Sequence, residues 1–297
     1  SKDDKQQDFN KEMISLSKVQ NAAILKIYGY SLTNFLNLDF PVIITEYMVN
    51  SSLDKALNSK PCKLTPIQKY IILLGISLGM KSLHSQGIIH RDLKPANILL
   101  NEQFYPQICD FGISYISDLE LSLILMNTVA GTPLYQAPEI LNGESSYNYK
   151  IDVYSFSLIA YEIITGEKPF KNFKNIYKLQ SEIINGSRPN TTMIKDFSIK
   201  NFLELCWSFV PTVRPSFDEI YEELLDEKYM KFFGITSEKV EEYLSLFDKE
   251  LKEKNALSKI QSEYELIANL LEKMNSDDIK WTRILPSADP FIKKFYL

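Results

Sequence analysis

The stretch of this sequence that decides the fold is His90-Arg91-Asp92-Leu93-Lys94-Pro95-Ala96-Asn97. It is followed by the apolar run Ile98-Leu99-Leu100 and, after one more short strand-like segment, by Asp110-Phe111-Gly112. A chance match to about six fixed positions is on the order of 10⁻⁸ per window, and a second motif close behind lowers this further. The two motifs therefore indicate a specific chemistry rather than a surface loop that happens to be polar.

These two motifs resemble the catalytic loop and the metal-binding turn of eukaryotic-type protein kinases. Phosphoryl transfer asks a protein mainly for positioning and for neutralisation of negative charge. The resemblance implies that Asp92 accepts the proton of the attacking hydroxyl and that Lys94 neutralises the transferred phosphate. It implies that Asn97 and Asp110 hold Mg²⁺ through hard oxygen ligands. It also implies that His90 packs behind the loop without transferring a proton.

The same resemblance predicts an ATP site. Glu12 lies where kinases place the glutamate of their small-lobe helix, although a solvated helix face is the alternative for a glutamate at helical spacing. Thr45 matches the gatekeeper, and Glu46 to Met48 match the hinge, whose backbone meets the adenine edge. We therefore expect ATP and Mg²⁺ as cofactors. The predicted cofactor-binding residues are Glu12, Thr45, Glu46, Met48 and Leu99.

Three further matches lie in the second half of the chain. The run Gly131-Thr132-Pro133-Leu134-Tyr135-Gln136-Ala137-Pro138-Glu139 looks like the end of an activation segment, in which Thr132 is a predicted catalytic residue. Asp152 matches the buried acid that braces the backbone of the catalytic loop. Arg214 matches the buried partner of Glu139. A lone carboxylate and a lone guanidinium would each be costly inside a helical lobe, so we expect these two to pair.

The predicted substrate is a protein serine or threonine hydroxyl. Lys94 and the Gly131-Thr132 pair are serine/threonine-kinase features, whereas tyrosine kinases carry a different loop. The runs Leu205-Cys206-Trp207 and Arg214-Pro215-Ser216-Phe217 look like the tyrosine-kinase-like group of serine/threonine enzymes. The resemblance covers about residues 8 to 229.

The pattern along the chain predicts an α+β, two-lobed architecture. Apolar residues at helical spacing predict a helix over 9–19, and β-rich segments at 24–30 and 41–47 predict a pair of strands. Thr65 and Pro66 open an apolar stretch through residue 83 that suits a buried helix. Helices are also predicted over 150–165 and within 199–225. Strands early and helices later are typical of an α+β fold.

The resemblance divides the chain into a partial small lobe (1–48), a mostly helical lobe (49–229) and a helical C-terminal extension (230–297). In the extension, Val240, Leu244, Phe247 and Leu251 share one helix face. A second apolar stripe over 260–274 predicts another helix. The two helices could bind a protein partner.

Two kinase features do not occur within these residues: a glycine-rich strand pair and the lysine that grips the phosphates. The first glycine is Gly29, and the family's lysine, about fifteen residues before Glu12, would fall just ahead of Ser1. We expect that the chain is an N-terminally truncated piece of an active kinase, and that residues 1–297 alone transfer little phosphate. The alternative is a pseudokinase-like binding module.

Composition excludes other classes of protein. The chain has 297 residues, 45% of them hydrophobic and 24% charged, as in a soluble globular protein, and its cysteine usage leads us to expect the reducing cytoplasm. Its net charge of −5 makes nucleic acid an unlikely partner. Three cysteines far apart suit neither zinc nor a disulfide framework. The longest apolar run, residues 70–80, is shorter than the roughly 20 residues of a membrane span.

Overall fold

The computed structural model describes residues 19, 21–31, 42–59, 62, 64–110, 115–116, 133–144 and 147–247. The chain divides into two compact units, Ser1–Phe247 and Asp248–Leu297, and every described residue belongs to the first. The predicted helix over 260–274 and Leu251 therefore lie outside the described residues. Of the predicted helix over 9–19, only residue 19 is described. In the part of the chain that is described, no helix is long and apolar enough to cross a membrane.

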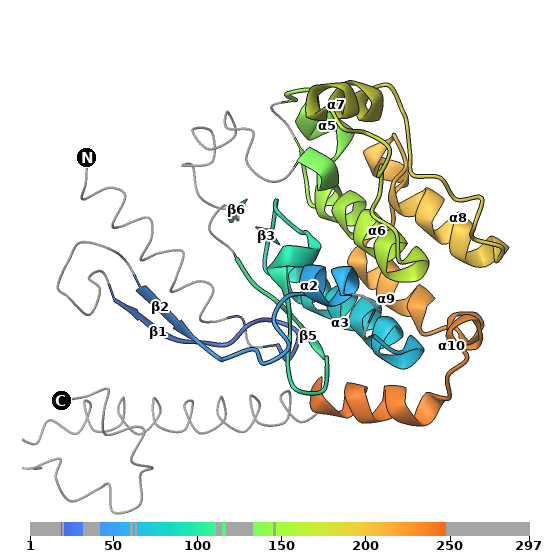
Figure 1. The fold of residues 1–297 in the computed structure, drawn as a ribbon. Coiled ribbons are helices and arrows are strands. Elements are labelled where there is room, and N and C mark those ends of the chain that lie inside the picture. Colours follow the sequence, from blue (N-terminus) through green and yellow to red (C-terminus); the bar gives the residue numbers. More distant parts are fainter. Residues whose placement is uncertain are drawn as a thin grey trace, which may run out of the picture. The chain divides into compact units, whose positions relative to one another are not determined.

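All the strands of the described chain lie in its first half, beside α2 (Leu53–Asn58) and the long helix α3 (Pro66–Ser85), and the second half is helical (Figure 1). In chain order the elements are β1 (Ile27–Ser31), β2 (Val42–Thr45), α2 (Leu53–Asn58), α3 (Pro66–Ser85), β3 (Ile88–Ile89), η1 (Pro95–Asn97), β4 (Ile98–Leu100), β5 (Pro106–Ile108), β6 (Tyr115–Ile116), η2 (Pro133–Tyr135), α5 (Pro138–Leu141), α6 (Lys150–Thr165), α7 (Ile176–Ile184), α8 (Phe197–Cys206), η3 (Pro211–Val213), α9 (Phe217–Leu224) and α10 (Glu227–Phe233). Residues 237–247 are also helical.

The strands form three two-stranded antiparallel sheets, β1–β2, β3–β6 and β4–β5. The predicted pair of strands is confirmed with narrower bounds, and its register places Ile27 opposite Thr45 and Ser31 opposite Val42. In the β4–β5 hairpin, Leu99 pairs with Gln107. Backbone bonds tie the segments 23–25 and 50–52 to the two edges of this hairpin. The hairpin therefore joins the strand-rich part of the chain to the helices.

Helix α3 forms where the apolar stretch predicted it. The Thr65 side chain accepts from the Gln68 amide and the Gln68 side chain accepts from the Thr65 amide, which completes a capping box. Most of α3 is buried, so its sequence is apolar around nearly the whole circumference. Gly75 and Gly79 face β5: a Cβ at Gly75 would lie 2.4 Å from Pro106, and one at Gly79 would lie 2.7 Å from Ile108. The two glycines thus let the strand approach the helix closely.

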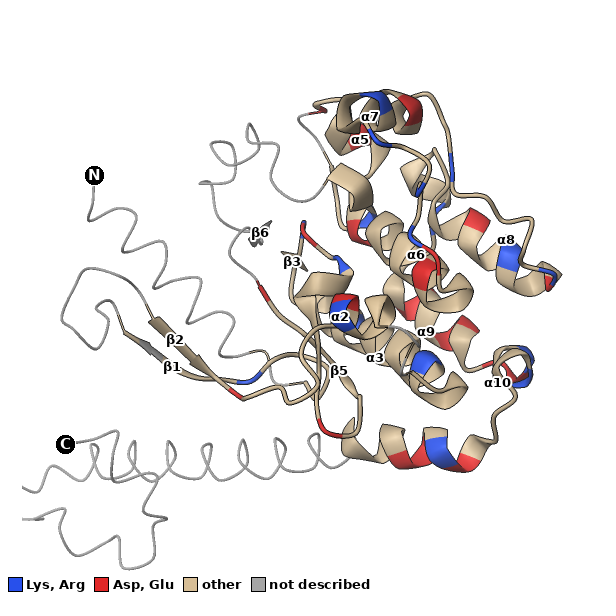
Figure 2. Ribbon diagram, in the orientation of Figure 1, with Lys and Arg blue, Asp and Glu red and all other residues tan. Residues whose placement is uncertain are grey.

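The second core helix, α6, spans the predicted residues 150–165. It ends where Gly166 adopts φ = 69°, a left-handed conformation that glycine takes at little cost. Its residues from Ile151 to Ile163 are all buried. The region predicted to be helical over 199–225 holds α8 and α9, separated by η3. In the described part of the chain, basic and acidic residues are interspersed on α8, α10 and residues 237–247 (Figure 2).

The predicted apolar face of the extension helix is confirmed at the three of its residues that the structure describes. Val240 is buried, and Leu244 and Phe247 pack against the core. The most deeply buried residue of this helix is Tyr243, at 1% exposure, which the sequence pattern did not single out. The face that packs inward is therefore centred on Tyr243.

Candidate active site

Three of the predicted catalytic and metal-binding side chains meet in the loop between β3 and β4. The Lys94 Nζ lies 2.5 Å from Asp92 Oδ2. The Asn97 Nδ2 donates to the Asp92 backbone carbonyl at 2.9 Å and to Asp92 Oδ2 at 3.1 Å. The Asp92 side chain is 11% exposed and that of Lys94 is 20% exposed. The cluster thus presents a carboxylate that can accept a proton beside a fixed ammonium group.

Asp152, on α6, holds the backbone of this loop, as predicted. Its Oδ2 accepts from the His90 amide at 2.9 Å and its Oδ1 accepts from the Arg91 amide at 2.9 Å. Arg91 has φ = 69°, a left-handed conformation that is costly for arginine and has to be imposed by its surroundings. Both oxygens of one fully buried carboxylate therefore fix two successive amides of the loop.

The third partner of Asp152 is His84, near the end of α3, whose Nε2 lies 2.9 Å from Asp152 Oδ2. Its ring packs against Phe217 with the ring centroids 5.1 Å apart. Burial by itself would raise the pKa of Asp152. The hydrogen bond and charge of His84, together with the ring and the amide of His90, outweigh burial and lower the pKa below its ordinary value.

His90 links the loop to the strand that precedes Asp110. Its Nε2 lies 3.0 Å from the Cys109 carbonyl, and its Nδ1 accepts from the Asp92 amide at 3.3 Å. Since a carbonyl can only accept, Nε2 carries the proton and Nδ1 does not. Burial lowers the pKa of His90, which favours this neutral form. The predicted packing of His90 behind the loop is confirmed.

The two predicted metal ligands lie at one end of the β4–β5 hairpin. Asn97 comes directly before β4 and Asp110 comes shortly after β5, and antiparallel strands bring these two positions together. The Cys109 amide donates to the Asn97 carbonyl at 2.9 Å. Asp110 is exposed and has φ = 64°. Because the Asn97 amide nitrogen is turned to Asp92, its Oδ1 is the atom left for a cation. This oxygen set suits Mg²⁺.

Two of the predicted nucleotide-contacting residues, Glu46 and Leu99, are linked through Gln107 at the middle of the hairpin. The Gln107 Nε2 donates to the Glu46 carboxylate at 3.4 Å, and Gln107 is the cross-strand partner of Leu99. After Met48 the chain runs beside β4, since the Asn50 amide donates to the Leu100 carbonyl at 3.1 Å. The Thr45 hydroxyl donates to the Glu46 carbonyl at 3.2 Å. Two other predicted site residues, Glu12 and Thr132, lie outside the described residues.

A second buried acid of α6, Glu162, was not predicted from the sequence. The Tyr135 hydroxyl donates to Glu162 Oε2 at 2.7 Å, and the Tyr135 carbonyl accepts from Ser155 Oγ at 2.8 Å. Burial raises the pKa of Glu162. Both bonds fasten η2 to α6. The available signal was a single carboxylate within the largely apolar run 156–164, which needs a partner when buried.

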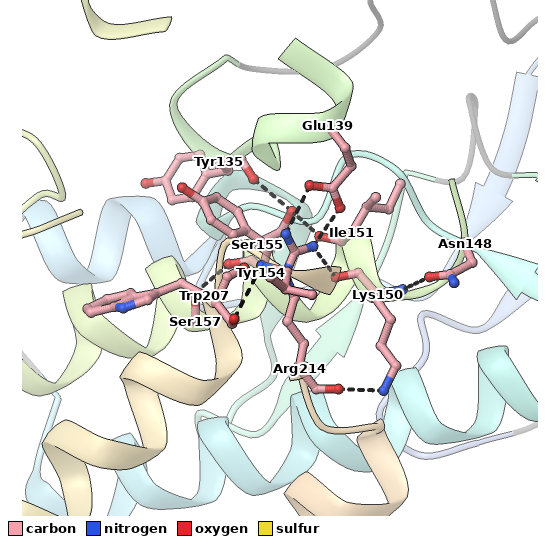
Figure 3. A network of polar contacts seen from close by, with 12 residues as sticks. Tyr135, Glu139, Asn148, Lys150, Ile151, Tyr154, Ser155, Ser157, Trp207 and Arg214 are labelled. Carbon is pink, nitrogen blue, oxygen red and sulfur yellow. Dashed lines mark hydrogen bonds and ion pairs between the residues drawn. The ribbon is translucent and has the colours of Figure 1, made fainter. Parts of the chain in front are cut away.

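The predicted Glu139–Arg214 pair is confirmed and is bidentate (Figure 3). Arg214 Nη1 lies 2.6 Å from Glu139 Oε1, and Nη2 lies 2.9 Å from Oε2. Its remaining donors reach the Ser208 and Lys150 carbonyls. The guanidinium also stacks over Tyr154, 5.2 Å from the ring centroid. The pair anchors α5, and with it the end of the segment before α6, to the helical core.

The Asp152 carboxylate gives the first testable prediction. Replacing Asp152 with asparagine should lower the free energy of unfolding by about 2–3 kcal/mol at pH 7, since charge-assisted hydrogen bonds are lost. Because the folded-state pKa is lowered, this contribution is complete above the ordinary aspartate pKa of about 3.9 and is lost as the pH falls through the folded-state value. Urea unfolding of both proteins between pH 7 and pH 3 should show the difference shrinking.

The exposed Asp218, which pairs with Lys81 at 3.1 Å, provides the control. Asp218→Asn should change stability by less than about 1 kcal/mol at any of these pH values. A difference between the wild type and Asp152→Asn that stays constant down to pH 3 would contradict the assignment of charge to Asp152.

Comparison of the sequence with known proteins finds a matching family model and similar proteins. A family model described as the protein kinase domain matches residues 1–230. A Dictyostelium discoideum protein named "Probable serine/threonine-protein kinase" is 34% identical over 221 residues, which are 74% of this chain and 23% of that protein. The dual specificity protein kinase pyk3 of the same organism is 35% identical over 227 residues, 75% of this chain and 16% of that protein. The chain thus spans less than a quarter of either relative.

Proposed function

This chain belongs to the protein kinase domain family, and on that premise we propose that it is the catalytic part of a serine/threonine kinase, which transfers the γ-phosphate of ATP to a protein hydroxyl. The observation that carries this proposal is the cluster of Asp92, Lys94 and Asn97 on a loop whose backbone is fixed by Asp152. A loop held in this way keeps its charged groups in one geometry, and phosphoryl transfer depends on positioning.

Each residue has a role that its surroundings support. Asp92 orients the attacking hydroxyl and accepts its proton. Lys94, whose ammonium group already lies against Asp92, neutralises negative charge on the group in transit. Asn97 Oδ1 and the Asp110 carboxylate would hold Mg²⁺, which when bound neutralises the phosphates of ATP. His90 stays neutral and keeps the Cys109–Asp110 segment beside the loop.

The hydroxyl specificity rests on the loop lysine and on the relatives. Lys94 is a serine/threonine-kinase feature, and its ammonium group lies against Asp92, the proposed base for the substrate hydroxyl. Of the two relatives described above, one carries the serine/threonine-kinase designation and the other is named a dual specificity kinase. We infer serine and threonine as the main acceptors, within the tyrosine-kinase-like group. Glu46, Met48 and Leu99 would contact the adenine, with Thr45 as gatekeeper.

A second candidate function is a pseudokinase-like binding module. Residues 1–297 hold neither a glycine-rich strand pair nor the phosphate-gripping lysine of a kinase, and a protein without them would still be able to bind partners through this fold. The intact set of Asp92, Lys94, Asn97 and Asp110 argues against it. A polypeptide of residues 1–297 should transfer little phosphate in either case, because the lysine's charge and the loop's amides are needed to stabilise the transferring group.

The experiment that tests the proposed function adds a glycine-rich strand pair and the phosphate-gripping lysine to the chain. An extended protein would carry, fused ahead of Ser1, a glycine-rich strand pair and a lysine-bearing strand of the kind that protein kinases use. We expect it to phosphorylate a generic serine/threonine substrate at least about 10²-fold faster than residues 1–297, a typical worth for one electrostatic group. Incorporation of radiolabelled phosphate measures the rate.

A matched extended protein with the fused lysine changed to methionine should stay near the rate of residues 1–297. An extended protein that binds Mg²⁺–ATP but transfers no phosphate would support the binding module instead.

A further inference from the structure

Residues 237–247 pack their inner face against α3 and the β4–β5 hairpin. The Tyr243 ring lies 4.7 Å from that of Tyr105, directly before β5, in an edge-to-face arrangement. It also lies 5.4 Å from the ring of Phe247 on the same helix. The Tyr243 hydroxyl occupies the space beside Gly75, since a Cβ there would lie 2.2 Å from the oxygen. Tyr243 therefore fills a notch that α3 opens by lacking a side chain.

The missing side chain at Gly75 lowers the stability of α3, and the packing of Tyr243 and Pro106 has to offset this loss. A glycine in the middle of a helix is less favourable than alanine. Gly75 has ordinary helical neighbours on both sides and no turn that would require it. The missing side chain leaves room for Tyr243 and for Pro106, the first residue of β5. The glycine thus makes room for both the extension helix and the hairpin at one point.

The hairpin held at this point carries the proposed nucleotide and metal residues. Leu99 lies in β4, Asn97 directly precedes it, and Asp110 follows β5. The bond from the Cys109 amide to the Asn97 carbonyl ties the two ends together at 2.9 Å. A strand pair of three residues each has little stability of its own, so it depends on what packs against it.

We propose that Tyr243 is a positioning residue: through Tyr105 and Pro106 it holds the β4–β5 hairpin, and so keeps Asn97, Leu99 and Asp110 in register for Mg²⁺ and nucleotide. The proposal rests on the proposed function for the identity of the ligand. It makes residues 237–247 part of the catalytic unit, because they act on the site through the hairpin.

Hydrogen exchange in the chain of 297 residues tests the proposal without nucleotide. Tyr243→Ala should speed exchange of the amides in residues 97–110, the Cys109 amide included, by about tenfold relative to the wild type, as local opening becomes easier. The control is Tyr229→Ala. Tyr229 is also 1% exposed and also contacts an aromatic ring, that of Phe202, but it lies on α10. It should leave residues 97–110 within about twofold of the wild type.

Equal acceleration of residues 97–110 in both variants would overturn the proposal, because Tyr243 would then act only through global stability. If the alanine variants fail to fold, Tyr243→Leu and Tyr229→Leu give the same comparison while keeping apolar volume. Repeating the hydrogen exchange with Mg²⁺–ADP tests the proposed kinase function separately from the positioning role of Tyr243. A wild-type chain that gains no protection in residues 97–110 would count against the proposed function, whereas the comparison without nucleotide judges Tyr243 alone.

Discussion

Replacing Arg214 with methionine is expected to lower the free energy of unfolding by about 3–5 kcal/mol. The arginine side chain is fully buried and its partner Glu139 is 6% exposed, so the variant leaves a carboxylate in the core without its cation. The variant also loses the bonds to the Ser208 and Lys150 carbonyls and the stacking on Tyr154. Methionine fills much of the volume, so the loss is mainly electrostatic.

Urea denaturation followed by far-ultraviolet circular dichroism measures this change. The double variant Glu139→Gln with Arg214→Met should recover part of the lost stability, because the uncompensated charge is removed. As a surface control, Lys171→Met breaks the exposed pair with Glu167 and should cost less than about 1 kcal/mol. An Arg214→Met protein within about 1 kcal/mol of the wild type would show that the pair contributes little.

Replacing Asp92 with asparagine should lower the rate of phosphotransfer by the extended protein by about 10²–10⁴-fold, the usual worth of a positioned general base. The amide of asparagine cannot accept the hydroxyl proton as a carboxylate does, and the fixed partner of Lys94 loses its charge. Affinity for Mg²⁺–ATP should change little, since Asn97 and Asp110 are kept. Steady-state kinetics with a protein substrate separate the two effects.

The Asp92→Asn substitution should leave the fold intact. Asn97 donates to the Asp92 backbone carbonyl as well as to its side chain, and the backbone bond remains. The melting temperature of Asp92→Asn should therefore stay close to that of the unchanged extended protein. Glu102→Gln, an exposed acid in the hairpin turn, is the charge-matched control and should retain full activity. A retained rate in Asp92→Asn would remove Asp92 from the role of base.

Part of this structure could be predicted because the signals are local. Thr65 and Pro66 start α3, and the apolar pattern over 150–165 gives the bounds of α6. Caps and periodicity involve residues within a few positions of one another, so they can be read before the chain folds. The catalytic loop is likewise one continuous motif, and the resemblance that it carries supplied the pairing of Glu139 with Arg214.

The sequence by itself thus determined the family, the loop that holds Asp92 and the main helices. Only the tertiary structure decided that Tyr135 bonds to Glu162, that His84 bonds to Asp152 and that Tyr243 fills the space beside Gly75. These partners lie far apart in the sequence, 27 residues in the first pair and 68 in the second. No local periodicity links them, because their contact depends on how whole helices pack, and packing is settled only when the core closes.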